Sequence, residues 1–278
     1  IIAQLCYTLC VAQRKISIDR KLLKELYLRK SLSTRRIGAL LNCSWSTIRN
    51  RISELGIPLK NPSQARMRYQ KYDFAGGELL RAYMIGFRIG DLNVYKTSEK
   101  SELIVVRCHT TQKEQVDVIK KLFQKFGKVT ISVRNGHFHA NCFLNQTFHF
   151  LIPKDFSDVS RKGFPAFVAG YTDAEGNFIL NQNRARFKID SYDFHVLNSI
   201  TEWLHVKGIQ YKLRQIARKG DLQYIRGVKS KYNGDLWRLN INQAKSLKKF
   251  ITKIIPFLKH RKRIKDARIS LENIISRE

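Results

Sequence analysis

The feature that most restricts the fold is a short apolar segment that occurs twice at a fixed spacing. Residues 167–178 read FVAGYTDAEGNF, and residues 83–94 read YMIGFRIGDLNV. An offset of 84 residues places Gly86 on Gly170 and Asp91 on Glu175. Each copy has a glycine within an apolar run and delivers one acid at its end. We therefore expect two related halves that use the same structural element.

The small residues of the two copies predict a close contact between two helices. Gly86 is followed four positions later by Gly90, and Gly170 is followed four positions later by Ala174. Residues four apart lie on one face of a helix, and residues without bulky side chains let two backbones approach. If the helices cross at these faces, their C-terminal ends lie side by side. The acid that ends each copy is then expected to lie beside the other, at the centre of the molecule.

The two acids predict a metal site. Asp91 and Glu175 would repel each other at close range unless positive charge lies between them. A divalent cation that prefers oxygen ligands, such as Mg²⁺, resolves this repulsion. We predict that Mg²⁺ is bound at Asp91 and Glu175, with Gly90 and Ala174 as neighbouring ligand positions. Carboxylates that share such a cation beside DNA can hydrolyse a phosphodiester bond.

The charge of the chain predicts a polyanionic partner. Its 278 residues include 52 Lys and Arg against 22 Asp and Glu, a formal net charge of +30, and 43% of the residues are hydrophobic. The hydrophobic content is sufficient for one to three folded domains. A field this positive needs an anionic partner, and nucleic acid is the commonest one. No segment is apolar for the roughly 18 residues that a membrane span needs, so we expect no membrane partner.

The cysteine pattern indicates an intracellular, reducing compartment. Cysteines at positions 6, 10, 43, 108 and 142 are odd in number and include no C-x-x-C pair. This pattern argues against zinc and against a disulfide framework. The apolar stretch IIAQLCYTLCVAQ has no preceding basic residue and no small-residue cleavage site, so we interpret it as a helix or ordered lead-in. Bacterial or archaeal cytoplasm, or an organelle, would suit this composition.

Residues 1–60 are expected to form an all-α domain that resembles a helix-turn-helix unit. Apolar residues recur at helical spacing in SIDRKLLKELYLRKS, STRRIGALLN and CSWSTIRNRISELGI. The predicted core residues are Ile37, Leu40, Leu41, Ile48, Ile52 and Leu55. Residue types early in the last helix suit base edges and phosphates, and we predict DNA contacts by Trp45, Thr47, Arg49 and Asn50. A plain three-helix bundle is the alternative, but residues 1–76 carry 15 Lys and Arg against 4 Asp and Glu.

From residue 77 onward the sequence predicts two α+β subdomains with the same order of elements. After each repeated segment come two strands, a helix, two strands and a helix, with Asn135-Gly136 as a hairpin turn in the first copy. In the second copy a long basic loop separates the strand-like segments YKLRQIA and DLWRLNI. We expect a basic linker at 61–76, subdomains at 77–155 and 164–278, and a connector at 156–163. Two copies in one chain suggest a pseudo-two-fold monomer.

The strands predict basic faces on both sheets. In RARFKID, apolar residues alternate with Arg and Lys at the period of a strand, and acids are nearly absent from the polar positions. A β-ribbon with Arg, Lys and Asn can read a DNA major groove. The predicted DNA contacts in the second copy are Asn181, Arg184, Arg186, Lys188, Lys212, Arg214, Arg238 and Asn240. Those in the first copy are Arg107, Ser132, Arg134, His137 and His139.

The repeated segment resembles a known family motif. VAGYTDAEG at 168–176 resembles the LAGLIDADG motif of homing endonucleases, and MIGFRIGDL at 84–92 resembles a degenerate first copy. The resemblance runs from residue 77 to residue 278 and includes the order and spacing of the elements. It implies a monomeric endonuclease that saddles double-stranded DNA with its β-sheets and cuts both strands across the minor groove with Mg²⁺. Only the last acid of each motif carries over as a metal ligand, whereas Asp173 matches an acid that is not usually a direct ligand.

The first motif departs from the family pattern. Arg88 lies within the helix, Ile89 replaces a common acid, and Leu92 replaces the usual glycine. The metal-ligand acid Asp91 is kept, so cleavage is expected, with nicking or loss of activity as alternatives.

Basic residues commonly accompany such sites and polarise water or the scissile phosphate. By its place relative to the final strands and helices, the first copy offers Lys154 as a catalytic residue. The second copy offers Lys259 or Arg261, although a solvated basic helix start explains these two equally well. Thr110 and Ser191, at the ends of the second strands, could hold water in the pocket.

Three functions are consistent with the sequence. The first is a site-specific double-strand DNA endonuclease encoded in an intron or as a free-standing mobile gene. The second is a DNA-binding regulator that does not cut, as in sporulation-type regulators that join a LAGLIDADG-like domain to a helix-turn-helix. The motif acids tend to be missing from those regulators and are present here, which favours the enzyme. The third is a maturase that binds intron RNA, which the sequence leaves open.

Overall fold

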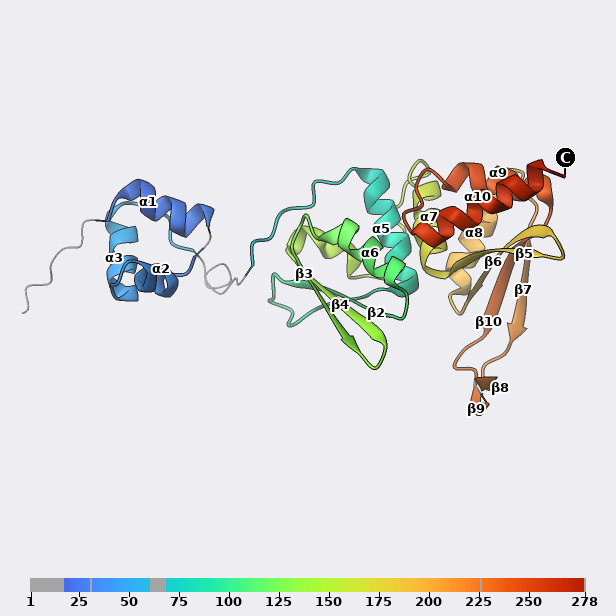
Figure 1. The fold of residues 1–278 in the computed structure, drawn as a ribbon, viewed down its shortest axis with the longest axis horizontal. Coiled ribbons are helices and arrows are strands. Elements are labelled where there is room, and N and C mark those ends of the chain that lie inside the picture. Colours follow the sequence, from blue (N-terminus) through green and yellow to red (C-terminus); the bar gives the residue numbers. More distant parts are fainter. Residues whose placement is uncertain (1–17, 31, 61–68, 226, 278) are drawn as a thin grey trace, which may run out of the picture. The chain divides into compact units, whose positions relative to one another are not determined.

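A computed structural model describes residues 18–30, 32–60, 69–225 and 227–277. The chain divides into two compact units, residues 1–70 and residues 71–278. Figure 1 follows the chain from the blue N-terminal helices to the red C-terminal helices. Among the described residues, no helix is both long and apolar enough to cross a membrane.

The first unit is a small helical domain. Its elements are α1 (Arg20–Lys24), a π-helical turn η1 (Glu25–Arg29), α2 (Thr34–Leu40) and α3 (Trp45–Glu54). The Ser33 side chain accepts a hydrogen bond from the Arg36 backbone N–H, and the Ser44 side chain accepts one from Thr47. These side-chain caps fix where the second and third helices begin, because the first N–H groups of a helix have no partner within it.

The core of the first unit differs from the predicted core at one position. Ile37, Ile48 and Ile52 are fully buried, and Leu41 and Leu55 are packed against them, as predicted. Leu40 is 64% exposed, so the prediction for this residue was wrong. The space is filled instead by apolar side chains of the preceding helix, namely Leu23, Leu26 and Tyr27.

The second unit contains two subdomains with a common order of helix, two strands, helix, two strands and helix, and the second has two extra strands and an extra C-terminal helix. The first comprises α5 (Glu78–Asp91), β1 (Asn93–Lys96), β2 (Ile104–Thr110), α6 (Lys113–Phe123), β3 (Lys128–Arg134), β4 (His137–Leu144) and the 3₁₀ helix η2 (Gln146–Leu151). The second comprises α7 (Phe164–Glu175), β5 (Gly176–Asn181), β6 (Arg184–Ser191), α8 (Phe194–Val206), β7 (Lys212–Ala217), β8 (Leu222–Ile225), β9 (Val228–Lys231), β10 (Leu236–Ile241), α9 (Ala244–Ile254) and α10 (Arg261–Ile275). The predicted α+β class and the predicted order of elements are confirmed.

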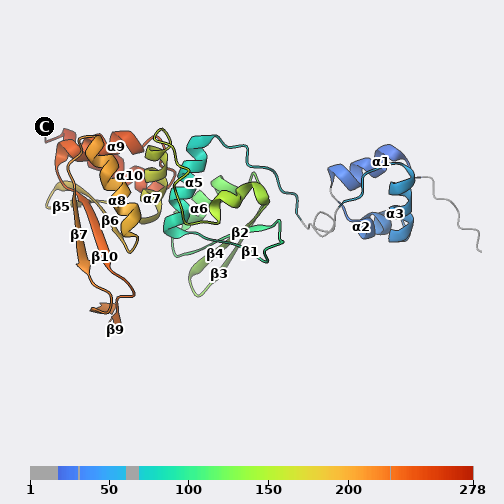
Figure 2. The same cartoon turned by 180° about the vertical axis from the view of Figure 1, so that it is seen from behind.

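Each subdomain has one four-stranded antiparallel sheet. The strand orders are β1-β2-β4-β3 and β5-β6-β10-β7. In both views of the second unit the helices lie on one side of the sheets, and the opposite sheet faces carry no helix (Figures 1 and 2). The first hairpin turns at Asn135 and Gly136, whose φ values of 49° and 75° suit a two-residue turn, as the sequence predicted.

The alternation of residues along the strands decides which face packs on the helices. Ala185, Phe187 and Ile189 of β6 are buried in the core, while the intervening basic residues lie on the other face. This core also includes residues of α5 and α7, so a single apolar cluster extends through both subdomains. The two subdomains therefore form one compact body rather than two separate domains.

Two connecting segments are more ordered than the sequence suggested. The predicted long basic loop between β7 and β10 contains a two-stranded hairpin, β8–β9. At the end of the predicted linker, the Tyr72 N–H donates to the Phe126 carbonyl at 2.8 Å, and the Phe74 N–H donates to Thr147 Oγ1 at 2.9 Å. This end of the linker therefore belongs to the folded second unit.

A candidate metal centre and nucleic-acid interface

The helices α5 and α7 cross at backbone distance. A Cβ atom placed on Gly86 would lie 2.1 Å from the Phe167 carbonyl oxygen, and one placed on Gly170 would lie 2.1 Å from the Tyr83 carbonyl oxygen. Only glycine fits at either position, because real Cβ atoms do not approach backbone so closely. The near-identical environments of the two glycines show a local pseudo-two-fold axis. The predicted close contact between the two repeated helices is confirmed.

The crossing brings the C-terminal ends of the two helices together. A Cβ atom on Gly90 would lie 2.4 Å from Ala174 Cβ and 3.2 Å from Glu175 Cγ. Asp91 is the last residue of α5, and Glu175 is the last residue of α7. Both carboxylates are partly buried at this point, one from each repeat. The structure thus places the two predicted metal-ligand acids beside each other, next to Gly90 and Ala174.

A side-chain network of the first subdomain holds Asp91. Gln115 Nε2 donates a hydrogen bond to Asp91 Oδ2, and Gln115 Oε1 accepts one from Thr110 Oγ1 at 2.8 Å. Burial raises the pKa of Asp91 to about 6, against the opposing effects of Gln115 and of the Arg263 guanidinium. Gln115 therefore fixes the orientation of the carboxylate. Thr110, one of the two residues that could hold water, donates to Gln115 here.

The environment of Glu175 is less favourable to its charge. Burial and the nearby carboxylates of Asp91 and Asp193 raise the pKa of Glu175 to about 7, against the effects of Arg263 and Lys154. Two adjacent acids with raised pKa values lack sufficient positive charge around them. A cation bound between two such acids would be strongly stabilised by their negative charge. Carboxylates with perturbed pKa values in a cleft are typical of functional sites.

Arg263 is the basic residue that the sequence reasoning missed. It lies on the face of α10 that also carries the buried residues Ala267, Ser270 and Ile274, and it lines a cavity of about 640 Å³ together with Glu175. One guanidinium nitrogen donates to Asn177 Oδ1 at 3.3 Å, and Nε has no partner among the described residues. Helical spacing from Ala267 and Ile274 would have identified this position, because 263, 267, 270 and 274 share one face.

The three predicted basic residues are placed differently. Lys154 is exposed just after η2, close enough to Glu175 for its charge to oppose the rise in the pKa of that acid. Lys259 lies over the Tyr83 ring with Nζ 4.9 Å from the ring centroid. Arg261 is exposed at the first position of α10, with no part in the cavity that Arg263 lines. Neither Lys259 nor Arg261 lines the cavity beside Glu175, which Arg263 lines.

Asp173 acts as a structural acid. Its Oδ2 atom accepts hydrogen bonds from the Tyr83 hydroxyl at 2.6 Å and from the backbone N–H groups of Lys259 and His260 at 2.6 and 3.0 Å. Asp173 therefore ties α5, α7 and the start of α10 together. Since α10 carries Arg263, this contact also fixes the guanidinium near the paired acids. The expectation that Asp173 is not a metal ligand agrees with this bonding.

Arg88 plays a corresponding structural role in the first copy, which has no acid at the position equivalent to Asp173. Ile89 stands where the second copy has Asp173, and its neighbour Arg88 is only 5% exposed. The Arg88 guanidinium donates to the carbonyls of Leu151 and Ile152 at 2.9 and 3.5 Å, and also to the Leu92 carbonyl. A buried cation thus secures carbonyls at the end of η2, where the second copy uses a buried acid to secure N–H groups.

The second sheet presents a basic concave face. Its cross-strand partners include Lys188 with Asn240, Asn240 with Lys212, and Arg238 with Arg214. A cavity of about 360 Å³ on this face is lined by Ile179, Asn181, Arg186, Lys188, Lys212, Arg214, Arg238, Asn240 and Asn242. Arg184 pairs with Asn181 at the outer end of the same sheet. The structure therefore brings together all eight residues that were predicted for this half.

The same face also carries one acid, Asp190, for which the sequence predicted no role. Asp190 accepts two hydrogen bonds from Arg238 at 2.5 and 2.7 Å and lies 3.8 Å from Lys188 Nζ. Two of the guanidinium nitrogens of Arg238 are thereby occupied. Arg238 is consequently held in a fixed orientation rather than fully free for a ligand.

The first sheet has a corresponding polar face. Cross-strand pairs join Arg107 with Asn141, Ser132 with His139, and Arg134 with His137. Arg107 Nε donates to Asn141 Oδ1 at 3.2 Å, and another guanidinium nitrogen donates to the Tyr95 hydroxyl at 2.8 Å. The predicted residues of this half therefore share one sheet face, with Arg107 partly engaged by its neighbours.

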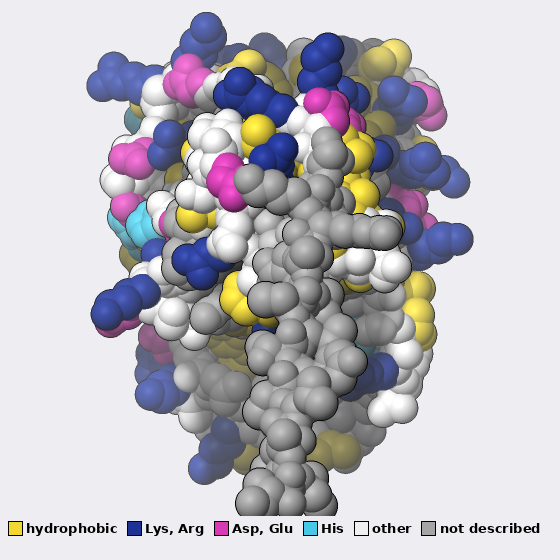
Figure 3. Space-filling model, turned by 90° about the vertical axis from the view of Figure 1, so that its left-hand side faces the viewer, with side chains coloured by type: hydrophobic (Ala, Val, Ile, Leu, Met, Phe, Trp, Pro, Cys, Tyr) yellow, Lys and Arg dark blue, Asp and Glu magenta, His cyan; other side chains and the backbone are white. Residues whose placement is uncertain are grey.

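In the first unit, the predicted DNA-contacting residues lie at the start of α3. Trp45, Arg49 and Asn50 are exposed, whereas the Thr47 hydroxyl lies 2.8 Å from Ser44 Oγ within the helix cap. Figure 3 shows this side of the whole molecule, where Lys and Arg side chains outnumber the separate Asp and Glu side chains. DNA contact by these residues remains a prediction.

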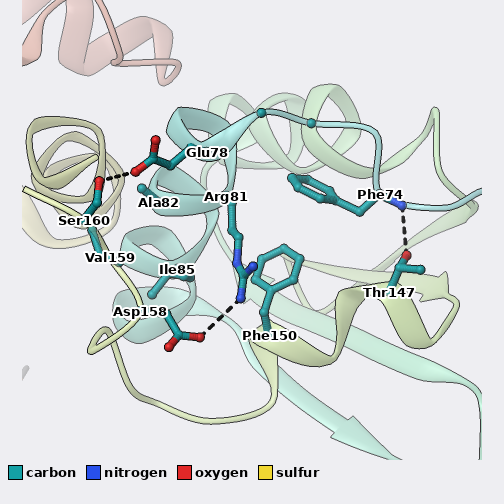
Figure 4. Close-up of a pocket in the computed structure, with 12 residues that line it drawn as sticks. Phe74, Glu78, Arg81, Ala82, Ile85, Thr147, Phe150, Asp158, Val159 and Ser160 are labelled. Carbon is teal, nitrogen blue, oxygen red and sulfur yellow. Dashed lines mark hydrogen bonds and ion pairs between the residues drawn. The ribbon is translucent and has the colours of Figure 1, made fainter. Parts of the chain in front are cut away.

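A second cavity lies at the opposite end of α5 from Asp91. Its volume is about 400 Å³, and its charged residues are already paired (Figure 4). Arg81 lies 3.3 Å from Asp158, and the Ser160 hydroxyl donates to Glu78. These contacts attach the connector to the first subdomain and leave no unpaired acid there.

Comparison with known proteins identifies the second half of the unit. Residues 165–255 match the family model of the LAGLIDADG-like domain. These residues include α7 with Glu175 and the whole second sheet. Over these residues the second subdomain is similar to the LAGLIDADG-like domain. The first subdomain lies outside the matched residues and shares the repeated segment and the strand order of the second.

Individual relatives are distant. An uncharacterized protein of Methanocaldococcus jannaschii, MJ0398, is 27% identical over 181 residues, which cover 62% of this chain and 65% of that protein. The chain thus spans about 65% of the length of the curated relative that it matches. Similar solved structures include I-DmoI in complex with DNA and Mn, with 17% identity, a TM-score of 0.45, and coverage of 64% of this chain and 96% of that one.

Two further solved structures extend the comparison. The homing endonuclease I-WcaI bound to its DNA recognition sequence has 11% identity and a TM-score of 0.46, with coverage of 68% and 86% of the two chains. Full-length DUF199/WhiA from Thermatoga maritima has 14% identity and a TM-score of 0.46, with coverage of 74% and 62%.

Proposed function

We propose that this protein is a site-specific endonuclease that makes a double-strand break in DNA by Mg²⁺-dependent hydrolysis. The observation that carries the proposal is the meeting of Asp91 and Glu175 at the ends of two crossing helices. Each acid comes from a different repeat of one chain, so a monomer suffices to build the centre. Its place would be inside the cell, with duplex DNA as the partner.

The donor set of the centre suits a hard divalent cation. Mg²⁺ is commonly bound through one or two carboxylates, with the remaining positions filled by water and substrate phosphates. Asp91 and Glu175 supply two carboxylates in a setting that raises the pKa of both. Backbone carbonyls of Gly90 and Ala174 would complete the protein ligands. When bound, the cation would activate water and stabilise the charge that develops on the phosphate.

The surrounding residues have separate roles in the proposed reaction. Gln115 holds the Asp91 carboxylate in one orientation through its hydrogen bond. Arg263 and Lys154 place positive charge beside Glu175, where a scissile phosphate would carry negative charge. Lys259 is held over Tyr83 farther along the same helix junction. Preorganised donors of this kind stabilise transition-state charge at little reorganisation cost.

The two sheet faces would recognise the DNA. Arg, Lys and Asn side chains on the second sheet can donate to base edges in a major groove and to phosphates. The first sheet offers a more histidine-rich surface for the other half of the target. Exposed residues of α3 would add contacts or non-specific affinity through the first unit.

A selection for cleaved DNA tests the proposal. The protein is incubated with a randomised plasmid library and Mg²⁺, and the cut ends are sequenced, with EDTA as the control. The proposal expects cuts at one defined sequence, abolished by Asp91→Asn or Glu175→Gln while DNA binding persists. Arg263→Met should slow cleavage, whereas Arg261→Met should leave the rate unchanged. Tight binding without cutting by the unaltered protein would favour a DNA-binding regulator or an intron RNA maturase instead.

A further inference from the structure

We propose that the β8–β9 hairpin is an additional DNA-binding element, which contacts the phosphate backbone of duplex DNA outside the faces of the two four-stranded sheets. This inference rests on the proposed function only in its choice of duplex DNA as the ligand. The hairpin continues the chain from β7 into β10, two strands whose polar residues form the basic face of the second sheet. Figures 1 and 2 show it projecting beyond the ends of these strands, away from the helices.

The hairpin makes the two subdomains unequal. In the first subdomain, Asn135 and Gly136 alone connect β3 to β4. In the second, residues 218–235 intervene between the equivalent strands β7 and β10. These 18 residues contain five Lys and Arg against two Asp. The second subdomain thus reaches farther than the first, with a segment that carries net positive charge.

Hydrogen bonds at the base make the hairpin a defined projection. The Gly220 N–H donates to the Tyr232 carbonyl at 2.9 Å, and the Tyr232 N–H donates to the Asp221 carbonyl at 3.0 Å. The Asp221 carboxylate accepts from the Arg218 N–H at 2.7 Å, and the Asp235 carboxylate accepts from the Lys219 N–H at 2.9 Å. Both acids of the segment are therefore used at the base, which leaves the strands themselves without negative charge.

The strands carry two lysines beside exposed apolar groups. Tyr224 is the cross-strand partner of Lys229, and Leu222 is the partner of Lys231, so these four side chains share one face. All four are exposed, with Tyr224 at 72%. An isolated two-stranded sheet with exposed apolar residues gains little from folding alone and usually meets a partner.

The chemistry of this face fits a nucleic-acid backbone. Lysine ammonium groups bind phosphates, while tyrosine and leucine can pack on sugars between them. Four residues of strand at about 3.3 Å each extend the surface by about 13 Å, which is the length of about four phosphates of one DNA strand at 3.4 Å each. The described strands of the hairpin carry Lys229 and Lys231 and no acid, which favours an anionic partner. Continuity with the basic sheet face favours the same DNA molecule over a separate anionic protein.

The test compares two variants that remove equal charge. Lys229→Gln/Lys231→Gln alters the hairpin, and Lys249→Gln/Lys265→Gln alters exposed lysines of α9 and α10 on the helical side. Binding of the full chain to a 30-base-pair random duplex is measured by fluorescence anisotropy at several salt concentrations. Each phosphate contact contributes about 0.9 to the slope of log K against log salt, so the hairpin variant should lower that slope by about 2. The helical-side variant should leave the slope unchanged.

A second readout locates the contact. Hydroxyl-radical footprinting on the selected cleavage site should show protection lost on one side of the site only, because only one subdomain has the hairpin. An unchanged slope in the hairpin variant, or an equal loss in the control, would overturn the inference. Absence of cleavage by the unaltered protein, with the slope difference present, would remove the endonuclease proposal and leave the hairpin contact standing.

Discussion

Replacing Glu175 with glutamine should stabilise the metal-free protein at pH 8. The pKa of Glu175 is raised from 4.5 to about 7 by burial and by Asp91 and Asp193. An acid whose pKa is higher in the folded state binds more protons there than in the unfolded state. The folded state therefore loses stability as the pH rises from about 4.5 through about 7. Glutamine keeps the shape of the side chain and does not ionise, so it avoids this loss.

The magnitude follows from the pKa change. A rise from 4.5 to about 7 corresponds to about 3 kcal/mol at pH 8, since a pKa shift of one unit is worth about 1.36 kcal/mol. Solvent in the adjoining cavity screens part of this, so we expect the variant to gain about 1 to 3 kcal/mol. At pH 5 the carboxyl group is largely protonated in the folded state, and the gain should fall below about 1 kcal/mol.

The assay is urea unfolding at pH 5 and pH 8 in EDTA, followed by circular dichroism. Glu99→Gln, at an exposed turn, is the control and should show no gain at either pH. Added Mg²⁺ should stabilise the unaltered protein and narrow its difference from Glu175→Gln, because a ligand that binds only the folded state stabilises it. A variant that is no more stable than the unaltered protein at pH 8, or equally stabilised at pH 5, would refute the reasoning.

Three further predictions concern the residues that build the centre. Arg88→Met should cost about 3 kcal/mol in urea unfolding, because the buried carbonyls of Leu92 and Leu151 and the partly buried one of Ile152 lose a charged donor; stability equal to the unaltered protein would contradict this role. Gly86→Ala should cost about 3 kcal/mol in thermal unfolding, because its Cβ meets backbone, whereas Gly77→Ala, which meets nothing within 4 Å, should change stability by less than about 1 kcal/mol. Asp173→Asn should cost about 2 kcal/mol and slow cleavage through the displaced start of α10; unchanged values for both would exclude its role in positioning α10.

The sequence predicted the meeting of Asp91 and Glu175 because its causes are local and repeated. Gly86 and Gly170 in equivalent apolar runs required a close helix crossing, and the acid at the end of each run then had to meet its counterpart. The strand faces were equally predictable, since alternation in β6 separates Phe187 and its apolar neighbours from Arg186 and its basic neighbours. Both inferences needed only the periodicity of side chains along a helix or a strand.

Features that depend on tertiary contacts could not be predicted. Gln115 reaches Asp91 only because α6 packs beside the end of α5, and no spacing in the sequence encodes that contact. Arg88 finds carbonyls more than 60 positions away along the chain. Arg263 was within reach of sequence reasoning, because its position follows from the buried face of α10. The β8–β9 hairpin was not predicted because its strands are only four residues long and charged residues interrupt their apolar pattern.

The most direct measurement is the single-turnover cleavage rate of each DNA strand at the selected site in Mg²⁺. It compares Asp91→Asn, Glu175→Gln and the double variant with the unaltered protein. If the two carboxylates form one centre, each single variant should lose nearly as much rate as the double variant, since residues that act as a unit are not additive. A single variant that still cuts both strands at the unaltered rate would contradict the paired-carboxylate centre.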